Sequence, residues 1–186
     1  MKINKFLPIL LMLLVTVASC SKDDDPLPEA VNEEEVITTM EVTLTSGASV
    51  IILKTQDLDG DGPNAPVVTV SGNLAAGTTY DGVIRFLNEL ESPSSPEYNI
   101  TAEVEEEDLE HQVFFTVGSG LDVTTEYSNF DSAGNNLGTQ FKLTAGSASS
   151  GNLTFSLVHE PTKPNTGLAS AGGETDIDAT FSITIE

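Results

Sequence analysis

The sequence predicts an all-β domain built as an antiparallel β-sandwich of eight or nine strands. Three observations support this fold class. Apolar and polar residues alternate with a period of two along several segments, turns rich in Gly, Asn and Asp separate these segments, and no long run of helical periodicity lies between them. Short strands joined in this way pair antiparallel, and two such sheets pack face to face to bury their apolar sides.

The expected strands follow one another along the chain at similar spacing. The last is the clearest, because Ile177, Phe181 and Ile185 point to one face while Asp178 and Thr184 point to the other. Turn signals lie at 57–62, 72–73, 131–136, 145–152 and 172–173. Strand number and spacing indicate an immunoglobulin-like sandwich with strands at 36–44, 50–54, 67–70, 79–90, 112–117, 121–127, 137–143, 152–158 and 177–185.

One segment interrupts the strand pattern. Residues 100–110 hold six carboxylates, and the segment near 100–111 is expected to be either a short acidic helix that begins near Thr101 or a loop. Repulsion between like charges on one helix face opposes the helix unless a cation or a partner relieves it. The six acidic residues are Glu103, Glu105, Glu106, Glu107, Asp108 and Glu110.

The N-terminal segment predicts a lipoprotein signal peptide at 1–19. Lys2 and Lys5 precede an apolar stretch of about a dozen residues, which is too short to span a bilayer. Residues 17–20 resemble the lipobox of bacterial lipoproteins, which implies cleavage before Cys20 and diacylation of Cys20 with palmitate-type chains. The alternative is an ordinary secretory signal with a chance cysteine at the cleavage site.

The segment after Cys20 predicts the location of the protein. Residues 21–25 resemble the export signal of Bacteroidota lipoproteins, so we expect an outer-membrane lipoprotein that faces the cell surface, with a periplasm-facing protein as the alternative. Residues 20–35 are acidic and hold two prolines, which predicts a disordered tether before a single domain at 36–186. The expected membrane contact is the lipid anchor.

Charge excludes some functions and favours others. Beyond residue 19 the chain keeps five basic residues against all 29 acidic ones. Nucleic-acid binding requires the opposite charge and is excluded, whereas cations and basic partners are favoured. The sequence also lacks a nucleophile elbow, a zinc-protease motif and a phosphate-binding Gly-rich loop, and its one cysteine serves the anchor, so we expect no enzyme.

An Asp-rich turn at 57–62 is the first candidate cation site. Asp57, Asp59 and Asp61 alternate before a glycine, as in the first half of a calcium loop. The twelfth position is Val68 rather than a bidentate glutamate, which excludes an EF-hand. A partial Ca²⁺ site and an ion-free turn between strands both remain open.

The two histidines of the chain form the second candidate site. Glu110 precedes His111, Glu160 follows His159, and Glu107 would share a helix face with His111. Two imidazoles with carboxylates suit Zn²⁺, Cu²⁺ or iron if the histidines are adjacent in space. The alternative is two unrelated surface histidines. A third acidic cluster, for which simple solvent exposure is the preferred interpretation, is Glu174, Asp176 and Asp178.

Residues 57–66, 110–115, 159–161 and 172–176 together resemble a group of flavobacterial-type Bacteroidota lipoproteins. Members of this group carry the label "type 1 periplasmic binding fold superfamily protein". The label implies a two-lobed α/β solute-binding fold, and the resemblance implies that both histidines and the Asp-rich turn belong to shared motifs. It names no ligand.

Three functional hypotheses follow from these features. The first is a non-enzymatic, outer-membrane-anchored lipoprotein that binds a divalent metal or metal complex beside an outer-membrane transporter. The second is a structural or protein-interaction module of the cell surface without a small ligand. The third is a weak glycan binder, for which Tyr98 in the Pro-rich loop is the expected exposed aromatic residue.

Overall fold

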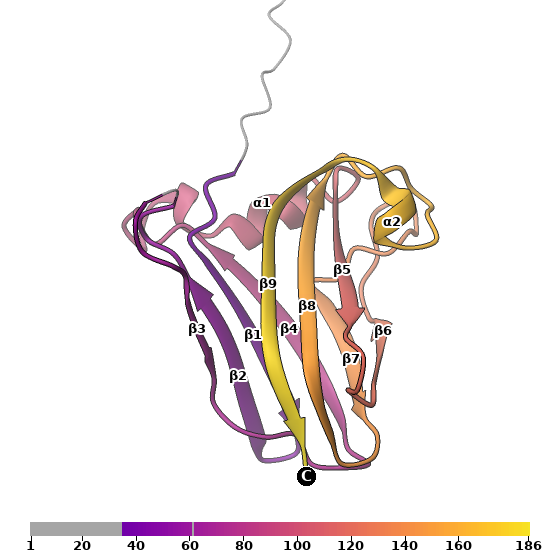
Figure 1. Cartoon of the computed structure of the whole chain (residues 1–186). Coiled ribbons are helices and arrows are strands. Elements are labelled where there is room, and N and C mark those ends of the chain that lie inside the picture. The colour runs from indigo at the N-terminus through magenta and orange to yellow at the C-terminus, as the bar shows by residue number, and fades with distance from the viewer. Residues whose placement is uncertain (1–34, 61) are drawn as a thin grey trace, which may run out of the picture. The chain divides into compact units, whose positions relative to one another are not determined.

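A computed structural model describes residues 35–60 and 62–186, which belong to one compact unit. This part of the chain forms nine strands and three short helical segments (Figure 1). The strands are β1 (Thr39–Ser46), β2 (Ser49–Gln56), β3 (Val67–Val70), β4 (Thr79–Leu87), β5 (His111–Val117), β6 (Val123–Tyr127), β7 (Gln140–Ala145), β8 (Ser149–His159) and β9 (Glu174–Ile185). The helical segments are the 3₁₀ turn η1 (Pro96–Tyr98), α1 (Ile100–Glu106) and α2 (Leu168–Ala171).

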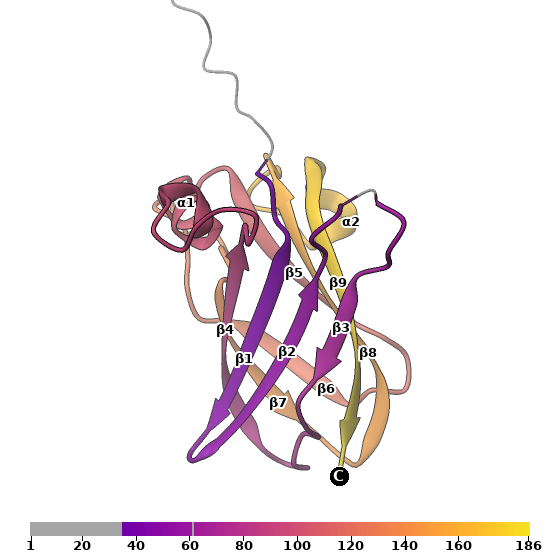
Figure 2. The same ribbon diagram turned by 90° about the vertical axis from the view of Figure 1, so that its left-hand side faces the viewer.

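The strands form two antiparallel sheets that pack face to face (Figure 2). One sheet has six strands in the order β3-β2-β1-β4-β7-β6, and the other has three in the order β5-β8-β9. Their inward faces share one apolar core, in which alternate residues such as Met40, Val42, Phe181 and Ile183 are buried. The predicted β-sandwich is therefore confirmed, and the two-lobed α/β fold implied by the lipoprotein label is wrong for this chain.

Several strand limits differ from the prediction because local hydrogen bonds end or extend the ladder. β4 stops at Leu87, where a turn closed by the Glu91 N–H and the Asn88 carbonyl begins. The segment before β7 leaves the predicted ladder, since the Leu137 carbonyl accepts from Val113 of the other sheet. β8 continues to His159 and β5 begins at His111, so both histidines are strand residues.

The acidic segment forms the helix α1 in spite of its charge. Ile100 and Val104 lie one turn apart on its inner face and are buried in the common core. The Thr101 hydroxyl donates to the Phe86 carbonyl and also accepts from the Phe86 N–H, which ties the helix to β4. Burial of an apolar face stabilises a short helix more than its own propensity does. The carboxylates therefore lie at a fixed place beside the end of the sandwich.

The register of β5 and β8 decides which polar residues meet at this end. His111 lies directly opposite His159, and His159 lies opposite Glu174 of β9.

In the described part of the chain, no helix has the length and apolar character needed to cross a bilayer.

Candidate metal centre

The two histidines lie side by side at the end of the three-stranded sheet. They are a directly opposed cross-strand pair, and their rings stack with centroids 4.9 Å apart and planes inclined by 12°. His111 is 0 % exposed and His159 is 8 % exposed. Cross-strand neighbours on one face of a sheet always come close, so the β5–β8 register produces this contact. The adjacency on which the histidine hypothesis depends is therefore present.

Glu35 brings a carboxylate to the histidine pair from the segment before β1. Its Oε1 lies 2.8 Å from Nε2 of His111, and its side chain is only 2 % exposed. On the other side of the ring, Nδ1 of His111 lies 3.2 Å from the carbonyl oxygen of Glu107. A carbonyl only accepts hydrogen bonds, so Nδ1 carries a proton, and Nε2 is the atom that faces the carboxylate.

This arrangement leaves one position that either a proton or a metal ion can occupy. The ionised carboxylate of Glu35 is an acceptor, so without a cation Nε2 of His111 must also carry a proton. A metal ion would take the place of that proton between the nitrogen and the carboxylate. The Nδ1–H bond to the Glu107 carbonyl would then orient the ring, as partners of metal-ligating histidines do.

Electrostatics favour charge on both members of the pair. Burial alone would raise the pKa of Glu35, but the hydrogen bond with His111 and the imidazole charges hold this pKa below its usual range. Burial alone would lower the pKa of His111, but the hydrogen bond with Glu35 and its negative charge raise it. Burial, together with the carboxylates of Glu35 and Glu107, raises the pKa of Glu103.

Three overlapping groups of side chains could hold a cation in this region. In each group every residue offers one ligand atom, and these atoms all lie within 4.8 Å of one another. Glu35 belongs to two of the groups, and so does His159. The groups are Glu35 with His111 and His159, Glu35 with Glu103 and Glu107, and Glu110 with His159 and Glu160. We call the five residues of the first two groups, Glu35, Glu103, Glu107, His111 and His159, the His–Glu centre.

Two carboxylate oxygens of the His–Glu centre have unmet hydrogen-bonding capacity. Oε2 of Glu35 and Oε2 of Glu107 are buried, and within residues 35–60 and 62–186 neither has a hydrogen-bond partner. A buried carboxylate oxygen without a partner is costly, because it has lost its water and gained nothing in exchange. Glu35 and Glu107 belong to one of the three groups, so a cation held there would offer such an oxygen a partner.

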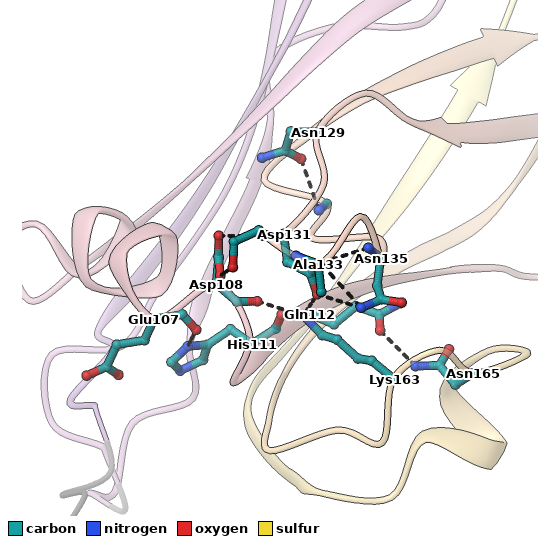
Figure 3. Close-up of polar contacts among 12 residues, drawn as sticks. Glu107, Asp108, His111, Gln112, Asn129, Asp131, Ala133, Asn135, Lys163 and Asn165 are labelled. Atoms are coloured by element: carbon teal, nitrogen blue, oxygen red, sulfur yellow. Dashed lines mark hydrogen bonds and ion pairs between the residues drawn. The ribbon is translucent and has the colours of Figure 1, made fainter.

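Lys163 holds together the backbone next to His111 (Figure 3). Its ammonium donates to the carbonyls of Asp108 at 2.7 Å and His111 at 2.5 Å, and to Oδ2 of Asp131 at 3.1 Å. Burial alone would raise the pKa of Asp131, but hydrogen bonds from Asn135 and Lys163 hold it below its usual range. These buried contacts of Lys163 connect three loops, which contain Asp108, Asp131 and Lys163 itself, and they position the start of β5.

The other residues named from the sequence lie around the centre in different roles. Glu107 is half-buried and follows α1 as its C-cap. Glu110 is exposed, with Oε2 3.8 Å from Nε2 of His159, and Glu160 is exposed next to that histidine. Of the third cluster, Asp176 is close enough to raise the pKa of His111, whereas Asp178 is exposed.

Sequence reasoning missed three residues of this region. Glu35 was assigned to the tether, Glu103 was one of six equivalent-looking acids, and Lys163 stood in a loop without a motif. The helical spacing from Glu103 to Glu107 to His111 was the one signal that could have selected Glu103. No local signal identified Glu35 or Lys163, because their partners are more than 30 residues away.

The Asp-rich turn uses its carboxylates locally. Oδ1 of Asp57 accepts from the N–H groups of Asp59 and Gly60, and Oδ2 of Asp59 accepts from the Asn64 side chain at 2.7 Å. Asp61 lies outside the described residues, so a Ca²⁺ site here stays a prediction.

The predicted anchor lies in a part of the chain that the structure does not describe, whereas the residue predicted to be the exposed aromatic is described. The signal peptide, Cys20 and residues 20–34 of the tether lie outside the described residues. Tyr98 is half-buried, whereas Phe130 is 54 % exposed, so Tyr98 is not the exposed aromatic residue that the glycan hypothesis expected.

Comparison of the chain with known protein families, with characterised proteins and with solved structures found no match.

Proposed function

We propose that this protein is a non-enzymatic lipoprotein that binds a divalent transition-metal ion at Glu35, His111 and His159. In this proposal Cys20 carries the lipid anchor in the outer membrane, and the acidic domain works beside an outer-membrane transporter. The observation that carries the proposal is the stacked pair of buried histidines with a buried carboxylate on Nε2 of one of them.

The donor set supports an ion of the first transition row. Two imidazoles and one carboxylate suit Zn²⁺, Cu²⁺ and iron, whereas Ca²⁺ and Mg²⁺ prefer oxygen ligands alone. The first group of ligand atoms spans no more than 4.8 Å, so little movement is needed to bring them around one ion. Glu110 lies close enough to His159 to complete the coordination or to exchange the ion with solvent.

Charge and burial favour uptake of a cation at this place. The chain has a formal net charge of −22, which attracts cations to its surface. The site offers them a desolvated carboxylate with one free oxygen. A metal ion held by protein side chains at the surface of a lipoprotein can be passed to a transporter, which is the accessory role proposed here.

Metal analysis tests this function. Residues 21–186, produced without the anchor, are dialysed against an equimolar panel of Zn²⁺, Cu²⁺, Fe²⁺, Mn²⁺ and Ca²⁺ and then analysed by mass spectrometry. We expect stoichiometric retention of a transition metal in the wild type and its loss in a His111→Ala/His159→Ala variant. A folded domain that retains no metal would leave the proposal without support, and retention of Ca²⁺ alone would move the site to the Asp-rich turn.

The interaction-module hypothesis is supported by a different part of the surface. Ile52 of β2 and Val83 of β4 flank Thr43 on the outer face of the six-stranded sheet and are 38 % and 46 % exposed. Val50 on the same side of β2 is 55 % exposed. Capture of one dominant protein partner by the metal-free domain, lost in an Ile52→Ser/Val83→Ser variant, would favour this function over metal binding.

A further inference from the structure

We propose that the His–Glu centre holds two divalent cations, with the Glu35 carboxylate as the bridge between them. The first ion lies at Glu35, His111 and His159, and the second lies at Glu35, Glu103 and Glu107. This inference rests on the proposed function and adds a second, oxygen-liganded ion to it.

The two oxygens of Glu35 face different surroundings. Oε1 contacts Nε2 of His111 at 2.8 Å, whereas Oε2 is buried and lacks a hydrogen-bond partner in the described part of the chain. The side chain is 98 % buried, so bulk water does not solvate the free oxygen. A carboxylate that offers one oxygen to each of two ions is the usual bridge in paired metal sites, where the ions lie about 4 Å apart.

Glu107 connects the two subsites through its main chain and its side chain. Its carbonyl accepts from Nδ1 of His111 and so orients a ligand of the first ion. The side chain of Glu107 belongs to the same group of possible ligands as Glu35 and Glu103, and its Oε2 is buried without a hydrogen-bond partner among the described residues. Two residues of this group, from distant parts of the chain, thus each have one buried carboxylate oxygen without a partner.

The helix α1 supplies the remaining ligand at the right spacing. Glu103 and Glu107 lie four residues apart, and the Glu107 N–H donates to the Glu103 carbonyl at 2.8 Å, so both side chains project from one face. Within residues 35–60 and 62–186, no lysine or arginine forms an ion pair with Glu35, Glu103 or Glu107. Glu35 pairs with the His111 imidazole, but Glu103 and Glu107 have no ion-pair partner in this part of the chain, so a metal ion would add the positive charge that they lack.

The chemistry of the second subsite differs from that of the first. Three carboxylates offer hard oxygen ligands only, which suit Mn²⁺, Ca²⁺ or Mg²⁺. Nitrogen ligands at the first subsite favour Zn²⁺ or Cu²⁺. Instead of a second metal ion, a proton shared between Glu103 and its neighbours could offset the repulsion among the three carboxylates. The experiment must distinguish a bound metal ion from this proton.

The test uses Zn²⁺ for the first subsite and Mn²⁺ for the second. Residues 21–186 are loaded with one equivalent of Zn²⁺, and Mn²⁺ is then titrated while free Mn²⁺ is followed by electron paramagnetic resonance. We expect one Mn²⁺ to bind beside the retained Zn²⁺. Glu103→Gln should weaken Mn²⁺ binding at least 10-fold and leave Zn²⁺ bound. Glu35→Gln should lower the affinity for both ions.

Glu106→Gln is the matched control, because Glu106 is an exposed acid of the same helix outside all three ligand groups. It removes the same charge and should change Mn²⁺ affinity less than 2-fold. Zn²⁺ binding without a second ion, or equal effects of Glu103→Gln and Glu106→Gln, would overturn the two-ion inference while the proposed function stands. Failure to bind Zn²⁺ at all would instead overturn the proposed function, and the two-ion inference with it.

Discussion

The Asp-rich turn and the His–Glu centre are two acidic regions of one domain, and they use their carboxylates in opposite ways. In the turn, Asp57 and Asp59 accept hydrogen bonds from residues at most five positions away and remain in contact with solvent. In the centre, Glu35 meets His111 across 76 residues of sequence and is almost fully buried. The turn resembles half of a calcium loop in its spacing, whereas no local spacing links Glu35 to His111 in the centre.

From this difference we expect that carboxylate oxygens without hydrogen-bond partners mark a cation site better than the spacing of acidic residues does. In the turn, Asp57 accepts from backbone N–H groups and Asp59 accepts from the Asn64 side chain, so both carboxylates have local partners without an ion. The centre leaves Oε2 of Glu35 and Oε2 of Glu107 without hydrogen-bond partners inside the described domain. If this distinction decides where metal binds, substitutions in the centre should affect metal affinity and substitutions in the turn should not.

The largest effect is expected from loss of both histidines. A His111→Ala/His159→Ala variant removes two of the three ligands of the first ion, so Zn²⁺ affinity should fall on the order of 1,000-fold, or about 4 kcal/mol. Isothermal titration calorimetry measures it. The variant must keep the circular dichroism of a β protein, and an unchanged dissociation constant in a folded variant would rule out the histidine site.

The next largest effect is expected on the unfolding free energy when the buried contacts of Lys163 are removed. Lys163→Met leaves the buried carboxylate of Asp131 without its cation, which should cost about 3 to 5 kcal/mol of unfolding free energy. Lys142→Met breaks an ion pair whose side chains are 52 % and 76 % exposed, so solvent screens the pair and its loss should change the unfolding free energy far less than Lys163→Met does. Urea denaturation compares the unfolding free energies of the two variants. A similar decrease in both would show that the buried contacts of Lys163 do not stabilise the fold more than an exposed ion pair does.

A smaller effect should appear in the pH dependence of the metal-free domain. The lowered pKa of Glu35 stabilises the fold above its ordinary value of 4.5, and this contribution is lost as pH falls through the folded value. The raised pKa of His111 stabilises the fold below its ordinary value of 6.5, and this contribution is lost as pH rises through the folded value. The pair therefore contributes most between pH 4.5 and 6.5.

Denaturation in the presence of a chelator measures this contribution, which we expect to be about 2 kcal/mol. Glu35→Gln removes the charge that raises the pKa of His111 and should flatten the decline above pH 6.5. Zn²⁺ should reverse the decline in the wild type, because a metal ion binds the deprotonated imidazole. An identical pH profile for the wild type and Glu35→Gln would contradict the pairing.

The smallest effect is expected in the turn. Asp57→Asn/Asp59→Asn keeps oxygen acceptors for the local hydrogen bonds, so unfolding free energy should change by no more than about 0.5 kcal/mol. Zn²⁺ affinity should not change. If Ca²⁺ raises the melting temperature of the wild type but not that of this variant, the turn is a cation site after all and the contrast between the two regions fails.

Much of the fold could be predicted from the sequence because strand alternation is a local property. The alternation in 177–185 fixed the buried face of β9, and Ala179, Phe181, Ile183 and Ile185 are buried as expected. The outcome for residues 100–110 was open, since charge repulsion and the burial of Ile100 and Val104 compete there. Packing decided it in favour of a helix.

The candidate site was only half accessible to sequence reasoning. His111 and His159 could be named as the two histidines of the chain, but their contact depends on the β5–β8 register, which sequence does not determine. Glu35 could not be found, because its role follows from the path of the chain into β1 past the start of β5. Long-range register and chain path are set by the whole core rather than by neighbouring residues.

Anomalous diffraction from crystals of residues 21–186 grown with Zn²⁺ would show most directly where the metal binds. Data collected on both sides of the zinc absorption edge locate the ion whatever its affinity. We expect an anomalous peak in coordination contact with His111, His159 and Glu35. A peak at Asp57 and Asp59, or none at the histidines of a zinc-saturated crystal, would contradict this expectation.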